Sequence, residues 1–112
     1  MSDDPSEAVA RMRALGDRLL SQPGVAAGTG FGAGRGLRVG GRIFAIFGDG
    51  EITVKLPKAR VAQLVEAGVG RRFDPGHGRL MKEWLTVAVD HAASWDELAD
   101  EGLAYVRQAG SG

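Results

Sequence analysis

The chain has 112 residues, of which 44% are hydrophobic and 25% charged, a composition typical of a folded domain and too apolar for a disordered tail. This length predicts a single domain, residues 1–112. Formal net charge is zero, and the lack of cysteine excludes disulfides, thiolate metal sites and a cysteine nucleophile. No stretch approaches the roughly twenty apolar residues of a membrane span, so we expect a cytoplasmic protein without a membrane partner.

The charge is distributed unevenly along the chain. Residues 1–34 hold three Arg against four acids, net −1; residues 35–82 hold ten Lys and Arg against four acids, net +6; residues 83–112 hold one Arg against six acids, net −5. Two interpretations stay open. The basic middle either attracts phosphates, or faces the acidic C-terminal helix within one fold.

The first half of the chain predicts one helix followed by strands. Pro5 suits the first helical position, and Met12, Leu15 and Leu19 recur at helical spacing. Paired glycines such as Gly40 and Gly41 accept the positive φ angles of a tight hairpin. The strands are predicted at residues 25–27, 37–39, 42–47 and 52–56.

The second half predicts a helix, a loop, a strand and a closing helix. The second helix runs from Pro57 to Gly68, residues 69–79 form an exposed loop, and residues 81–89 form a last strand. Ser94, followed by Glu97, is a capping box that starts the last helix. The fold class is therefore α+β: a central, mostly antiparallel sheet of about five strands flanked by three helices, in the order α-β-β-β-β-α-β-α.

We find no set of residues typical of an enzyme, a metal site or a cofactor site. The glycine run of residues 28–36 imitates a dinucleotide fingerprint, but it leads into a strand where that motif needs a helix. His77 and His91 are too few for a metal site, which needs three or four converging ligands. We therefore predict no catalytic residue, no metal and no cofactor.

The strongest candidate for a functional surface combines basic and aromatic residues, which hold phosphates and stack bases in nucleic-acid-binding proteins. Two alternatives stay open: Phe73 pins a loop to the core, and Trp84 packs on a sheet face. The nucleic-acid-binding candidates are Lys55, Lys58, Arg60, Arg71, Arg72, Arg79 and Lys82, and the interaction candidates are Phe73 and Trp84, with His77 in the same loop.

Several short sequence motifs resemble those of a known family. They are GGRIFA at 40–45, TVKLP at 53–57, FDPG at 73–76 and MKEWL at 81–85. Together they resemble the N-terminal domain of the TfoX/Sxy family and, more distantly, the MmcQ/YjbR-like proteins. The resemblance implies a helix-flanked antiparallel sheet and a non-enzymatic role, since TfoX relatives are linked to regulation of bacterial competence genes and YjbR relatives are proposed to bind DNA.

Three functional hypotheses follow from these observations. The first is a nucleic-acid-associated regulatory domain that binds DNA. The second is a protein-interaction module or homodimer, in which Trp84 and Trp95 belong to an uncovered apolar face. The third is an enzyme or small-ligand binder with a site between residues 28–36 and 74–79, which no positive signal supports.

Overall fold

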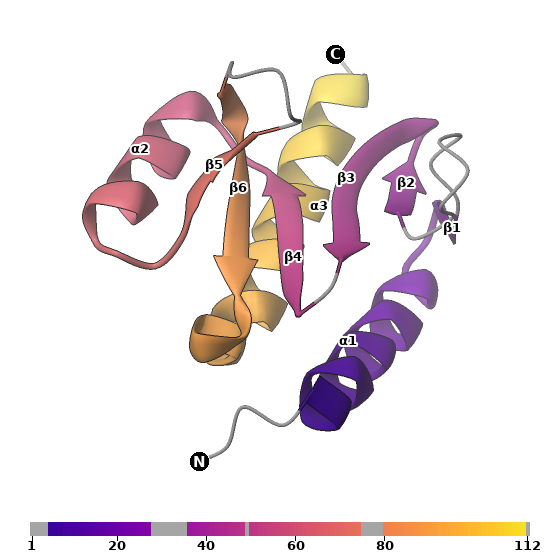
Figure 1. Ribbon diagram of the computed structural model, residues 1–112. Helices are drawn as coiled ribbons and strands as arrows, with labels where there is room; N and C mark the ends of the chain where they lie inside the picture. Colours follow the sequence, from indigo (N-terminus) through magenta and orange to yellow (C-terminus); the bar gives the residue numbers. More distant parts are fainter. Residues whose placement is uncertain (1–4, 28–35, 49, 75–79, 112) are drawn as a thin grey trace.

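The computed structural model describes residues 5–27, 36–48, 50–74 and 80–111, and Figure 1 shows its helices arranged around one sheet. The elements in chain order are α1 (Pro5–Leu20), β1 (Val25–Ala27), β2 (Gly36–Val39), β3 (Arg42–Gly48), β4 (Glu51–Lys55), α2 (Lys58–Glu66), β5 (Arg71–Phe73), β6 (Met81–Ala88), a 3-10 helix η1 (Val89–Ser94) and α3 (Trp95–Ser111). The predicted α+β class is confirmed.

The strands form one antiparallel sheet in the order β1-β2-β3-β4-β6-β5. The predicted hairpin between β2 and β3 is present, and Gly40 and Gly41 adopt the positive φ angles of 61° and 81° that it requires. β6 pairs with both β4 and β5, so the segment β4–α2–β5 crosses over the position that β6 fills.

Two predictions need correction. Residues 71–73 form the edge strand β5, where a loop was expected, which brings the described sheet to six strands instead of about five. A three-residue strand shows no alternation of polar and apolar residues, and the surrounding glycines and proline indicate a loop. The predicted capping box is also wrong: the Ser94 side chain makes no hydrogen bond with the residues that the structure describes, and the 3-10 helix η1 leads into α3 instead.

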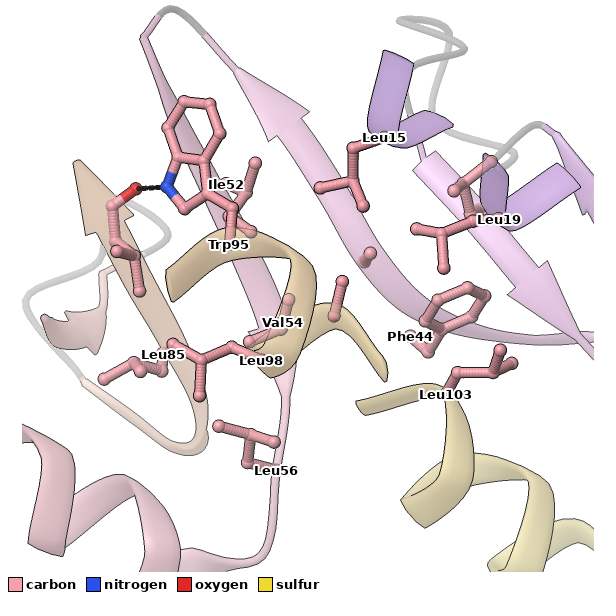
Figure 2. Packing of buried hydrophobic residues seen from close by; sticks show 14 of the residues in the cluster. Leu15, Leu19, Phe44, Ile52, Val54, Leu56, Leu85, Trp95, Leu98 and Leu103 are labelled. Atoms are coloured by element: carbon pink, nitrogen blue, oxygen red, sulfur yellow. Dashed lines mark hydrogen bonds between the residues drawn. The ribbon is translucent and has the colours of Figure 1, made fainter. Parts of the chain in front are cut away.

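The hydrophobic core lies between the helices and one face of the sheet. Ile52 and Val54 of β4 are fully buried on this face, opposite Val87 and Leu85 of β6. Figure 2 shows Leu15 and Leu19 of α1 and Leu103 of α3 close to Phe44 of β3. Helices from both ends of the chain therefore share a single core with the sheet.

Helix α3 packs directly on the strands. A Cβ added at Gly102 would lie 3.0 Å from the Lys55 carbonyl oxygen and 3.6 Å from Val54 Cβ. Ion pairs connect the neighbouring helices to it: Arg18 of α1 reaches Asp100 at 3.1 Å, and Arg60 of α2 reaches Glu101 at 2.9 Å. The helices thus lie on the core side of the sheet, and Figure 1 shows α3 behind β3 and β4.

The second face of β4 and β6 carries side chains of a different kind. Thr53 lies opposite Thr86 and Lys55 opposite Trp84, and because side chains alternate across a strand, all four point away from Val54 and Leu85. The two threonine hydroxyls are 2.9 Å apart and hydrogen-bonded. This face of β4 and β6 therefore carries a polar threonine pair next to a lysine and a tryptophan.

Candidate functional site

The candidate site is built around Trp84 and Lys55, which face each other across β6 and β4. The Lys55 ammonium lies over the indole ring, 5.2 Å from its centroid, in cation–π geometry. The same Nζ is 3.3 Å from a carboxylate oxygen of Glu83. Both contacts are partly exposed to solvent, with 31% of the Lys55 side chain and 44% of the Glu83 side chain accessible.

Two more lysines join this pair at a shallow hollow of about 430 Å³, which we call the lysine hollow. It is lined by Lys55, Lys58, Leu80, Met81, Lys82, Glu83 and Trp84. The three lysines come from the end of β4, the start of α2 and the start of β6. The fold therefore gathers three cations and one carboxylate around an aromatic ring.

The start of α2 adds to this positive potential. Pro57 occupies the N-cap position without a side-chain hydrogen bond, and the first turn contains no acidic residue. The exposed N–H groups at a helix start carry partial positive charge, which an acidic residue would usually offset. Here Lys58 occupies that turn, so the helix end and the lysines attract the same sign of charge.

Arg71 lies on the same sheet face but is engaged within the protein. Its guanidinium lies 3.0 Å from both carboxylate oxygens of Glu51. Because β6 lies between β5 and β4, this pair reaches across β6 beside Thr86, whose exposure is only 2%. Arg71 therefore helps to cover the threonine pair.

Arg60 lies at the interface between α2 and α3. It makes a two-pronged ion pair with Glu101, 2.9 Å from Nε to one oxygen and 2.9 Å from Nη2 to the other. The hydrogen bond to Glu101 raises the pKa of Arg60 above its usual value. One interpretation of the charge distribution was that the basic residues 35–82 face the acidic C-terminal helix, and the Arg60–Glu101 pair is such a contact. Among the described cations of residues 35–82, Arg60 is the one that forms an ion pair with α3.

The other predicted residues are only partly placed at the site. Arg72 and Phe73 are half-buried on the edge strand β5, and neither lines the lysine hollow. Phe73 is also absent from the core cluster and its packed neighbours, so it does not pin the chain to the core. Arg79 and His77 lie outside the described residues.

The two tryptophans have different roles. Trp95 is fully buried, and its indole N–H donates to the Val87 carbonyl oxygen at 3.0 Å, the dashed line in Figure 2. Trp84 is half-buried and does not belong to the core cluster or to the residues packed against it. Trp84 thus lies partly exposed on the second sheet face, at the lysine hollow. The hypothesis that Trp95 belongs to an uncovered apolar face is wrong, because Trp95 is buried in the core.

Elsewhere in the described residues the structure offers little for chemistry. A hollow of about 450 Å³ lies between α1 and β3 and is mainly apolar, with Arg13 and Asp17 as its charged residues. No group of three potential metal-ligating side chains comes together in the described ranges. In those ranges, too, no helix combines the length and the apolar character needed to cross a membrane.

The comparisons with known proteins bear on the family only. The family model described as YjbR matches residues 20–101, from the end of α1 into the first half of α3. This supports the more distant of the two resemblances seen in the sequence, and the TfoX/Sxy resemblance stays a prediction. Comparison with curated proteins and with solved structures gives no match.

Proposed function

The chain belongs to the YjbR family, and we propose that it is a non-enzymatic binding domain that contacts the phosphate backbone of nucleic acid. The observation that carries this proposal is the convergence of Lys55, Lys58 and Lys82 beside Trp84 at the lysine hollow. A regulatory role in gene expression, in the manner of competence regulators, is the wider function this binding would serve.

Electrostatics favours an anionic partner at this surface. Lys58 and Lys82 make no ion pair with any described residue, so their charges are not offset inside the fold. Lys55 shares its charge with Glu83 through a solvent-exposed contact, which stabilises the fold little. A phosphate can therefore approach all three without breaking a buried interaction.

Phosphate contacts have a measurable signature. Each neutralised phosphate of a duplex releases condensed counterions, so log K falls against log salt with a slope near −0.9 per contact. Arginines held by carboxylates, such as Arg60 and Arg71, contribute less because binding must first break their pairs. We therefore assign the main contacts to the three lysines.

The test is fluorescence anisotropy of labelled duplex and single-stranded DNA at about 50 mM and 200 mM salt. Replacing Lys58 and Lys82 together by Ala should weaken binding and flatten the slope by about one to two units. The matched control is Arg11→Ala with Arg13→Ala, two exposed arginines of α1 that carry the same charge but do not line the hollow. Equal losses in both double variants would show attraction by net charge alone and reject the site.

A second candidate function is protein interaction, and one observation favours it. Leu80 and Met81, which also line the lysine hollow, are 51% and 39% exposed. Exposed apolar side chains beside a tryptophan are typical of interaction surfaces. If no nucleic acid binds at 50 mM salt, light scattering of the free protein tests whether this patch makes a homodimer.

A further inference from the structure

A second hollow borders the lysine hollow. It measures about 470 Å³, within the range of ligand sites, and its lining includes Arg42, Ile43, Lys55, Glu83, Trp84 and Tyr105. We call it the tyrosine hollow. Lys55, Glu83 and Trp84 line both hollows, so the two are neighbouring parts of one surface.

The combined surface contains two aromatic rings in different settings. Trp84 is half-buried and outside the core cluster, whereas Tyr105 of α3 is half-buried and packs against that cluster. The core therefore holds Tyr105 in place while part of its side chain remains at the surface. Lys55 covers Trp84 through contacts that solvent weakens, so its ammonium can move to a phosphate at small cost.

Charge in the two hollows is predominantly positive. Arg42, Lys55, Lys58 and Lys82 contribute four cations, against one carboxylate from Glu83. Arg42 makes no ion pair with a described residue and is exposed at the start of β3. Cations thus line both hollows, Trp84 lines both as well, and Tyr105 lines the tyrosine hollow.

We propose that these two hollows bind single-stranded nucleic acid, with bases stacked on Trp84 and Tyr105 and phosphates held by the surrounding cations. This deepens the proposed function and depends on it. Aromatic rings interleaved with cations are the usual means of holding single strands, because every base presents a face for stacking. In a duplex those faces are already stacked on one another, so the rings would gain nothing from it.

The probes are labelled dT12, rU12, a 12-base-pair duplex and an abasic 12-mer that keeps the sugar-phosphate backbone. We expect both single strands to bind more tightly than the duplex and the abasic strand. Preference for dT12 or for rU12 identifies the natural strand as DNA or RNA, and either preference supports the proposal. Equal binding of the duplex and dT12 overturns it.

Two variants test the stacking residues. Trp84→Leu and Tyr105→Leu should each weaken dT12 binding by roughly five- to a hundredfold while changing duplex binding little. Tyr105→Phe keeps the ring and is the matched control, with binding expected within about twofold of wild type. If both leucine variants bind dT12 as well as wild type does, the proposal is overturned.

Intrinsic fluorescence provides a readout that does not depend on those leucine variants folding. Trp84 is partly exposed, whereas Trp95 is buried and hydrogen-bonded, so a stacked base should quench Trp84 selectively. In Trp84→Phe the ring remains for stacking, so dT12 should still bind but the quenching should vanish. Unchanged quenching in this variant overturns the assignment of Trp84.

Failure of this inference can be distinguished from failure of the proposed function. Three results together would support phosphate binding and reject base stacking. Duplex and single strands would bind equally, both would bind more weakly to the Lys58 and Lys82 double variant, and Trp84→Leu would leave binding unchanged. No binding of any probe at about 50 mM salt would reject both.

Discussion

Gly70, at the entry to β5, tests the packing of the edge strand most directly. A Cβ added there would lie 2.6 Å from the Thr86 carbonyl oxygen and 3.0 Å from Leu85 Cγ. Ordinary contact begins near 3.4 Å, so Gly70→Ala must move β5 away from β6 by several tenths of an ångström. Such overpacking costs about 1–3 kcal/mol, which lowers Tm by roughly 4–12 °C in a chain of this size.

Urea unfolding followed by circular dichroism measures this loss, and Gly48→Ala is the matched control. Its Cβ would lie 3.9 Å from the Glu51 carbonyl oxygen, an ordinary contact, in another strand of the same sheet. The control should be neutral or stabilised by about 0.4–1 kcal/mol, because alanine reduces the entropy of the unfolded chain. If Gly70→Ala matches wild type within about 0.5 kcal/mol, the close approach of β5 to β6 is refuted.

Two further predictions concern side-chain pairs. Thr53→Val or Thr86→Val alone leaves a buried hydroxyl without its partner and should cost about 1–2 kcal/mol in urea unfolding, whereas the double variant should be nearly as stable as wild type. If the loss of stability in the double variant equals the sum of the losses in the two single variants, the two hydroxyls are not coupled. Glu101→Gln should destabilise by about 0.2–1 kcal/mol at low salt, since its pair with Arg60 is one-third exposed. The loss should shrink in 1 M NaCl, and a loss that salt leaves unchanged would indicate packing instead of charge.

The parts of the fold that the sequence predicted are those with regular local patterns. Apolar Ile52 and Val54 alternate with polar Thr53 and Lys55, and β4 (Glu51–Lys55) lies where a strand was predicted at residues 52–56. The glycine pair between β2 and β3 required positive φ angles, which leave few alternatives to a hairpin. β5 escaped prediction because pairing with β6, not local sequence, holds it as a strand.

The candidate site was predicted in part for a similar reason. Lys55, Lys58, Lys82 and Trp84 were named from composition, and the fold brings them together at one hollow. Arg60 and Arg71 were named on the same grounds, but their carboxylate partners are 41 and 20 residues away in the chain, and no spacing rule reveals such pairs. Tyr105 was missed because it lies in the amphipathic helix α3, where an aromatic side chain usually indicates packing against the core.

The position of β6 between β4 and β5 also has a consequence for how the chain folds. β4 and β5 both precede β6 in the chain, and the position between them in the sheet is filled only by Met81–Ala88. Until β6 pairs, one edge of β4 exposes unpaired N–H and C=O groups, which invite pairing with another chain, and residues 71–73 have no strand to pair with. Folding should therefore be limited by insertion of a late strand, and protection of amide hydrogens from exchange in β4 and β5 should appear together with protection in β6.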